Sequence, residues 1–290
     1  MNSFFLACRY HLANVASSRS LIDPSSDFDL SVTSHTDRVR RAFMAIESAC
    51  SGQRPARVIL YLAKEDWKGP LPTNLLRLKE RGLEIRECED LGPHKKQQGY
   101  LSQQESFERP LVTIDDDVFY TPDLLQRLRN AWNANPHEIH CSRARRMLIQ
   151  RGQLMPYRTW PLCDTPHPSH LTFPTGVGGV IYPPSFLAQL KAAGTGFKKS
   201  CPLADDIWVH CQAVTNAVKI RQLAATSARF PDIPGSRRTG LFRSNLRDGG
   251  NDRQLVSTFP AELIAWLGSS GVSTSASRPV AERASSEKAA

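Results

Sequence analysis

Short apolar runs alternate with longer amphipathic stretches along the first 135 residues of the chain. Within one such stretch, Val39, Phe43 and Ile46 fall at helical spacing and would share one helix face. The predicted strands are 28–33, 57–62, 83–88 and 110–114. The predicted helices are 36–50, 72–81 and a third that starts at Pro122, with Thr121 as its N-cap, and ends near 133. This order predicts an α/β fold with a mostly parallel sheet flanked by helices.

The second half of the chain is less regular. Its predicted elements are paired strands at 139–141 and 144–150, a Gly-rich apolar run at 175–182, and helices at 184–193 and 203–214. Residues 1–28 are expected to form a weakly structured arm or a first helix. Residues 269–290 carry almost no bulky apolar side chains and are expected to be a disordered tail. Between the ends we expect a single domain over 29–268, with a regular half (29–135) and an irregular half (136–268).

Composition places the chain among ordinary globular proteins. Of its 290 residues, 40% are hydrophobic and 22% charged, which excludes collagen, whole-chain disorder and a disulfide-rich miniprotein. The apolar run Phe4–Cys8 is cut off by Arg9 and is too short for a signal peptide, and no run is long enough to span a membrane. The seven cysteines include no C-x-x-C pair. We therefore expect a cytoplasmic protein with reduced thiols.

Charge adds a second constraint. The chain has 37 Lys and Arg against 28 Asp and Glu, a formal net charge of +9. Arginines gather in two stretches, 137–158 and 221–253. Such stretches favour polyanions, namely nucleic acid, an anionic membrane face or phosphorylated substrates, although they would also suit a solvated basic surface.

Three consecutive acids give the strongest chemical signal. Asp115, Asp116 and Asp117 directly follow the apolar strand 110–114, and ligands of parallel sheets bind at such strand ends. Three neighbouring carboxylates repel one another, and a bound Mg²⁺ or Mn²⁺ would relieve that repulsion while accepting phosphate oxygens as further ligands. The structural alternative is an acidic helix N-terminus, but the expected cap, Thr121, comes several residues later.

Two further stretches could carry chemistry. Asp205 and Asp206 open a predicted helix ahead of the apolar Ile207 and Trp208, so one could serve as an N-cap and the other as a general base in a partly dry pocket. The stretch from Asp90 to Lys96 places two lysines after a Gly-Pro turn, where they could reach a diphosphate or simply form a solvated loop.

The order of these motifs resembles that of GT-A glycosyltransferases, in particular bacterial family 2-like proteins, over about 29–266. The matching residues are Ser31-Val32-Thr33-Ser34-His35-Thr36-Asp37-Arg38, then Asp90-Leu91-Gly92-Pro93-His94-Lys95-Lys96, the Asp-x-Asp of 115–117, and Asp205-Asp206-Ile207-Trp208. The resemblance implies a GT-A-type, Rossmann-like sheet, with 29–135 binding a nucleotide and 136–268 the acceptor.

The resemblance also implies roles for individual residues. Asp115 and Asp117 would hold Mn²⁺ or Mg²⁺, and Asp115 and Asp116 would contact the nucleotide sugar. The remaining donor-side residues would be Thr33, Ser34, Arg38 and Lys96. The later acidic pair usually reads Glu-Asp, so Asp206 takes the role of base and Asp205 that of its acceptor-side partner. One departure concerns the donor pocket, because Gln97 and Gln98 stand where an aromatic residue is expected.

The expected activity is therefore metal-dependent transfer of a sugar from a nucleotide-diphosphate sugar, with a UDP-sugar as the expected donor. The acceptor would be a glycan, a lipid-linked molecule or another hydroxyl compound, as in polysaccharide biosynthesis. The basic stretches could hold such an enzyme peripherally at the inner, anionic face of a membrane. The alternatives are a metal-dependent nucleotidyl- or phosphotransferase, and a non-catalytic polyanion-binding protein. No nucleic-acid module is recognisable, and acids would repel a phosphate backbone, so a nucleic-acid partner is not expected.

Overall fold

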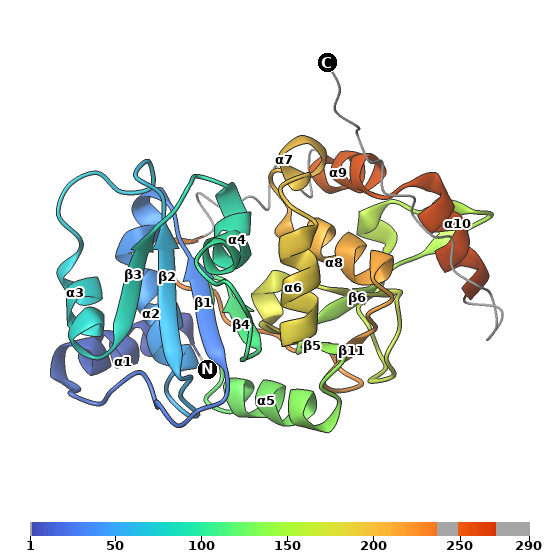
Figure 1. The fold of residues 1–290 in the computed structure, drawn as a ribbon. Helices are drawn as coiled ribbons and strands as arrows, with labels where there is room; N and C mark the ends of the chain where they lie inside the picture. Colours follow the sequence, from blue (N-terminus) through green and yellow to red (C-terminus); the bar gives the residue numbers. More distant parts are fainter. Residues whose placement is uncertain (1, 237–248, 271–290) are drawn as a thin grey trace, which may run out of the picture.

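The computed structural model describes residues 2–236 and 249–270. Its centre is a seven-stranded sheet with the strand order β11-β5-β10-β4-β1-β2-β3 (Figure 1). These strands are β1 (Asp29–Thr33), β2 (Arg57–Leu62), β3 (Leu83–Glu87), β4 (Leu111–Ile114), β5 (Ile139–Cys141), β10 (Val180–Tyr182) and β11 (Ile220–Gln222). Two small ribbons lie outside this sheet, β6 (Ala144–Arg146) with β9 (Thr172–Pro174), and β7 (Ile149–Gln150) with β8 (Gln153–Leu154).

Six of the seven strands run in one direction. β1 pairs in parallel with both β2 and β4, β2 with β3, and β5 with β11. Only β10 is reversed, and it lies between β4 and β5 with Ile181 opposite Val112 and His140. The predicted α/β class with a mostly parallel sheet is confirmed.

Helices cover both faces of the sheet. The helices are α1 (Ser3–Ala16), α2 (Ala42–Ala49), α3 (Thr73–Glu80), α4 (Lys95–Ser102), α5 (Leu124–Ala134), α6 (Pro184–Ala192), α7 (Phe197–Ser200), α8 (Asp205–Thr215), α9 (Gly250–Thr258) and α10 (Ala261–Ser270). Short 3₁₀ turns are η1 (Thr36–Arg40), η2 (Gly92–His94), η3 (Tyr157–Thr159) and η4 (Gly176–Gly178). Side chains of α1, α2, α3 and α5 form a core with one face of the sheet. Side chains of α4, α6 and α8 form a second core with the other face.

Strand alternation explains why there are two cores. In β2, Val58 and Leu60 belong to the core beneath α2 and α3, whereas Ile59 and Tyr61 belong to the core beneath α4. Successive residues of a strand point to opposite faces, so an all-apolar strand is buried on both sides. The apolar run at 57–62 has this character because it is a central strand.

Several local predictions need correction. The expected helix 36–50 is divided into η1 and α2, and the expected cap Thr121 is outside α5, which begins at Leu124. The stretches 139–141 and 144–150 do not pair with each other, because β5 joins β10 and β11 while β6 joins β9. Helix α4 was missed, since its sequence has no clear apolar periodicity.

The two ends of the domain differ from one another. Of the two alternatives for 1–28, the structure shows a first helix, α1, which buries Leu6, Tyr10 and Asn14 against α2 and α3. At the other end α10 continues to Ser270, so residues 269 and 270 are helical. The rest of the expected tail, 271–290, lies outside the described residues, as does 237–248.

Candidate functional site

The candidate site lies where the strand order of the sheet switches direction. β1 has β2 on one side and β4 on the other, and the carboxyl ends of β1 and β4 lie side by side. Ligands of open parallel sheets bind in the crevice at such a point. Asp115, Asp116 and Asp117 follow β4 at this edge, and Ser34 follows β1.

The middle acid of the three is turned into the protein. Asp116 is buried, accepts a 2.5 Å hydrogen bond from the Ser34 hydroxyl, and forms an ion pair with the guanidinium of Arg38. Arg38 also contacts Asp117 at 2.9 Å. Burial alone would lower the pKa of Arg38, but Asp116 and its two acidic neighbours outweigh burial and raise it. This arrangement anchors the acidic loop to the end of β1.

Lys96 joins the two acidic motifs. Its ammonium lies 2.5 Å from Asp115 Oδ1 and 3.1 Å from Asp205 Oδ2, and the side chain is only 4% exposed. Gln97 donates a further hydrogen bond to Asp205 Oδ2 at 2.8 Å. The neighbouring lysine points elsewhere, because Lys95 pairs with the buried Asp66. Of the two lysines singled out in the sequence, only Lys96 reaches the site.

The Gly-rich turn η4 closes over this ion pair. A Cβ atom on Gly176 would lie only 3.1 Å from Lys96 Nζ and 3.3 Å from Asp115 Oδ1. The backbone at Gly176 therefore lies directly against the ion pair, with little room for a side chain. The segment reaches this edge because β10, which follows it, is the reversed strand of the sheet. Glycine, which has no Cβ atom, allows this close approach of the backbone.

The paired acids at the start of α8 have different environments. Burial would raise the pKa of Asp205, but Lys96, His94 and Gln97 outweigh it and hold that pKa below its ordinary value. Burial and the charge of Asp205 raise the pKa of Asp206 to about 8. Asp206 keeps partial solvent exposure. Two carboxyl groups with pKa values pushed apart are typical of acid–base sites.

Asp117 is the acid best placed for a cation. Burial raises its pKa to about 7 in spite of Arg38, and its Oδ1 atom is buried without a hydrogen-bond partner. Backbone contacts fix the residue, since its carbonyl oxygen accepts bonds from Ile233 N and Ser236 Oγ. Within residues 2–236 and 249–270, no three His, Cys, Asp or Glu side chains are grouped as a metal site. Two carboxylates, from Asp115 and Asp117, still suit Mg²⁺ or Mn²⁺ that takes its other ligands from substrate and water.

The structure modifies the electrostatic argument made from the sequence. Repulsion among the three acids is already relieved by Arg38 and Lys96, neither of which is a metal ion. The acidic cluster therefore does not by itself require a cation. Among the described residues, the more specific feature is Asp117 Oδ1, which is buried with no hydrogen-bond partner and is available as a ligand atom.

Thr33 is the predicted site residue whose hydroxyl faces away. It donates to the carbonyl oxygen of Tyr61 on β2. His210 lies in the core with Nε2 bonded to the His170 carbonyl, and burial lowers its pKa to about 4. Asp252 accepts a 2.6 Å hydrogen bond from the backbone N–H of Tyr157 and so helps to position that loop.

Three residues of the site area were missed in the sequence. Gln97 stands where an aromatic residue was expected, and that departure was the available signal. The other two are Tyr157 and Arg145, and Tyr157 lies near enough to Asp206 to feel its charge. The Arg145 guanidinium is 5.3 Å from the centre of the Tyr157 ring, and both burial and the charge of Asp206 raise the pKa of Tyr157. No motif in the sequence marks this pair.

Comparison with known proteins gives only distant likenesses. No family model and no curated protein matches the chain. Among solved structures, the inositol-1-phosphate CTP transferase of T. maritima is 10% identical, with 79% of this chain and 97% of that chain covered and a TM-score of 0.47. S. aureus TarS 1-349 is 14% identical, with 71% of this chain and 59% of that chain covered and a TM-score of 0.46.

A third similar structure is the mannosyltransferase PcManGT from Pyrobaculum calidifontis in complex with GDP-Man and Mn²⁺. It is 13% identical, with 92% of this chain and 82% of that chain covered and a TM-score of 0.46. Because these TM-scores are below 0.5, we base the functional proposal on the residues of the site.

Proposed function

We propose that the protein is a metal-dependent glycosyltransferase that moves a sugar from a nucleotide-diphosphate sugar to a hydroxyl acceptor. One observation carries the proposal. Lys96 forms ion pairs both with Asp115, at the expected donor side, and with Asp205, beside the candidate base Asp206. The two motifs are 90 residues apart in the chain and meet at the switch point of the sheet.

The donor side would bind the nucleotide diphosphate. Asp115 and Asp117 would hold Mn²⁺ or Mg²⁺, which supplies positive charge to the departing diphosphate. Lys96 adds a fixed ammonium beside Asp115, and fixed charges aimed at developing charge are effective because they need no reorganisation. Arg38 and Ser34 act through Asp116 by holding the acidic loop in place. We take UDP as the first donor nucleotide to test.

The acceptor side would activate a hydroxyl group. Asp205 is held ionised by Lys96 and Gln97 and is not free to take up a proton. Burial and Asp205 raise the pKa of Asp206 to about 8, and the side chain is partly exposed, so its ionised form, which increases as the pH approaches 8, can accept the hydroxyl proton. Such a base contributes about 10²–10⁴-fold to a rate. If Asp206 acts from the face opposite the leaving group, the anomeric configuration inverts.

A glycan or lipid-linked acceptor is part of the proposal, as are a cytoplasmic location and peripheral contact with an anionic membrane. Of the arginines expected to make that contact, Arg143 bonds the Ala228 carbonyl and Arg221 pairs with Glu138, whereas Arg146 and Arg158 are exposed. Others lie outside the described residues, namely Arg237, Arg238, Arg243 and Arg247.

Calorimetric titration with UDP, GDP and CDP tests the donor side, with Mn²⁺ and with EDTA. We expect one nucleotide to bind only with metal and to lose binding in Asp117→Ala. Asp123→Ala is the matched control, because Asp123 is an exposed acid on the same segment that pairs with Arg127. Equal binding in EDTA, or loss in both variants, would contradict the metal assignment.

The reaction product separates glycosyl transfer from nucleotidyl transfer, which the donor side could also serve. Sugar transfer releases a nucleoside diphosphate and depends on Asp206. Nucleotidyl transfer releases pyrophosphate and needs no base on α8. Release of pyrophosphate with full activity in Asp206→Asn would replace the proposal by the alternative.

A further inference from the structure

The first helix has an exposed apolar stripe. One side of α1 is buried through Leu6 and Tyr10. The other side exposes Phe4 (71%), Phe5 (60%), Leu12 (67%) and Val15 (55%). At about 100° of rotation per residue, these four side chains fall within about 100° of the helix circumference and form one stripe. A contiguous apolar surface of this kind marks an interaction site.

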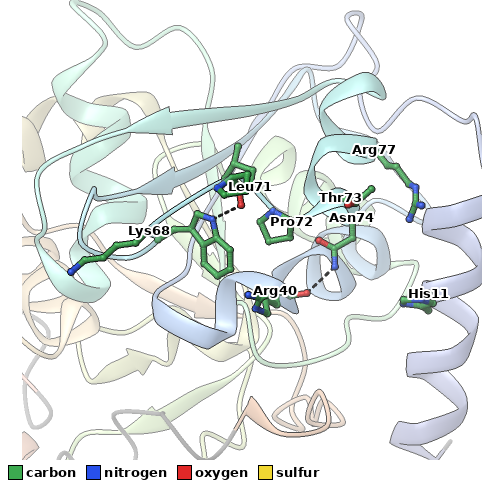
Figure 2. A pocket seen from close by; sticks show the side chains of 10 residues that line it. His11, Arg40, Lys68, Leu71, Pro72, Thr73, Asn74 and Arg77 are labelled. Carbon is green, nitrogen blue, oxygen red and sulfur yellow. Dashed lines mark hydrogen bonds between the residues drawn. The ribbon is translucent and has the colours of Figure 1, made fainter.

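A basic cavity of about 590 Å³ lies beside this helix, between α1, η1, α3 and the loop that precedes α3 (Figure 2). Its charged lining consists of His11, Arg40, Lys68 and Arg77, and no acidic side chain is among the described residues that line it. The cavity is therefore suited to an anion.

Hydrogen bonds and stacking hold the walls of the cavity in place (Figure 2). Arg40 lies over the Trp67 ring at 4.8 Å, and Trp67 Nε1 donates to the Pro70 carbonyl at 2.9 Å. Asn74 Nδ2 donates to the Arg40 carbonyl at 2.9 Å. These contacts tie η1 to the loop and to α3, so the basic groups belong to an ordered wall.

The stripe and the cavity form one continuous surface. His11 precedes Leu12 on α1 and lines the cavity, so the cavity begins at the edge of the stripe. Arg77 on α3 also reaches α1, where its guanidinium lies 3.5 Å from Asn14 Oδ1. Apolar and cationic groups are thus presented side by side.

We propose that this surface docks on an anionic phospholipid bilayer, with the α1 stripe in the interfacial region and a phosphate-bearing headgroup in the cavity. A helix with an apolar face beside basic groups lies in the membrane interface in this way. An anionic bilayer offers both of the required chemistries at once, apolar chains for the stripe and fixed negative charge for four basic side chains. None of the described helices is long and apolar enough to cross a bilayer.

The docking surface adjoins the candidate site. The 3₁₀ turn η1 carries Arg38, which faces the acidic loop, and Arg40, which faces the cavity. A bilayer at this surface would lie near the edge of the sheet where a lipid-linked acceptor would arrive. That consequence rests on the proposed function, whereas membrane binding itself does not.

The test uses Cys8, the one exposed cysteine of the seven, which lies on the stripe. The full chain, labelled there with a polarity-sensitive fluorophore, is mixed with vesicles rich in phosphatidylglycerol or made of phosphatidylcholine alone. We expect a blue shift with the anionic vesicles that weakens as salt is added. No shift, or the same shift with neutral vesicles, would overturn the proposal without reference to any variant.

Vesicle sedimentation of unlabelled variants then locates the contact. Phe4→Ser/Leu12→Ser should abolish binding, and Arg40→Ala/Lys68→Ala should weaken it about 25-fold, at about fivefold per basic residue. The controls are Val256→Ser, an exposed apolar residue of α9, and Lys198→Ala/Lys199→Ala, two exposed lysines of α7 that belong to neither the docking surface nor the arginine stretches.

Two outcomes of these measurements would overturn the inference. Controls that lose as much binding as the test variants would mean diffuse attraction between net charges. A dimer in analytical ultracentrifugation that dissociates in Phe4→Ser/Leu12→Ser, without vesicle binding, would mean that a second copy of the chain covers the stripe. Thermal melting shows that each variant is folded, and catalytic assays are not needed for either arm.

Discussion

The ion pairs of Lys96 should make a large contribution to stability, because they are buried. We consider Lys96→Met, which keeps most of the length of the unbranched side chain and removes its charge. The substitution leaves Asp205, 10% exposed, and Asp115, 28% exposed, without their shared cation. Breaking a buried pair in this way costs about 3–5 kcal/mol, since the remaining charge keeps its desolvation penalty. We expect a loss near the lower end, because Asp115 retains some contact with water.

A matched surface pair supplies the comparison. Lys198 and Glu89 are 2.6 Å apart, nearly the same separation as Lys96 and Asp115, but their side chains are 41% and 65% exposed. Lys198→Met should therefore cost only about 0–1 kcal/mol. Both variants are unfolded in urea at pH 7 and followed by circular dichroism, with the m-value as a check that the transition stays two-state.

The charge of Lys96 itself should not change between pH 6 and pH 9. Asp115 and Asp205 outweigh burial and raise the pKa of Lys96 well above its ordinary value, 10.5. A raised lysine pKa stabilises the folded state at every pH below the ordinary value, and the contribution is lost only above it. If Lys96→Met costs no more than Lys198→Met, burial does not decide the strength of the pair and the reasoning is wrong.

Further outcomes are expected for Asp206, Gly99 and the cysteines. Turnover, followed by release of nucleoside diphosphate, should rise as the pH approaches 8, because burial and Asp205 raise the pKa of Asp206 to about 8. Asp206→Asn should lower turnover by about 10²–10⁴-fold and remove the rise, and a rise that persists would exclude Asp206 as the base. Because the pKa of Asp206 is raised from 3.8 to about 8 in the folded protein, ionising this carboxyl group lowers the free energy of unfolding as the pH rises from about 4 to about 8. Urea unfolding should show a smaller loss of stability over that range in Asp206→Asn than in the unmodified protein. Gly99→Ala should destabilise by about 1–3 kcal/mol in urea unfolding, because the new Cβ would lie 2.4 Å from the Tyr61 ring, and a more stable variant would contradict the packing. A thiol reagent should modify Cys8 at once, the half-buried Cys88 more slowly and the five buried cysteines only on unfolding, and fast reaction of more than two thiols would contradict the burial.

Much of the sheet could be predicted because its central strands have a strong local signal. The strand at Arg57–Leu62 has the same bounds in sequence and structure, and the acids after Leu111–Ile114 lie at the carboxyl edge as expected. A strand buried on both faces must be almost entirely apolar, and such a run is recognisable without knowledge of its partners.

The pairing of the short strands could not be predicted. β5, β10 and β11 have three residues each, and their order in the sheet depends on partners that are 40 to 80 residues away. Local patterning carries no information on such pairings. We expected 139–141 to pair with 144–150 because strands that follow each other in sequence often pair. In the structure the antiparallel partner of β5 is β10 instead.

Helix α4 was missed for a related reason. It buries Lys95, Lys96 and Gln97, three polar residues that an apolar pattern would place outside. The side-chain nitrogen of each contacts a carboxylate from a distant segment, Asp66 for Lys95, Asp115 and Asp205 for Lys96, and Asp205 for Gln97. Buried polar groups need such hydrogen-bonding or charged partners, and the spacing of residues in the sequence does not identify these partners.

The position of β10 between β4 and β5 has a consequence for cutting the chain. The sheet crosses the junction at 135/136, since β4 comes before it and β5 and β10 after it. A fragment 1–135 would end on the bare edge of β4, and a fragment from 136 onward would present the matching edge of β10 with the side chains of Val180 and Tyr182 uncovered. The unpaired N–H and C=O groups of an exposed edge strand readily form hydrogen bonds with another strand. The two pieces, expressed apart, would behave as complementing fragments that regain the site only by rejoining along this one strand pair.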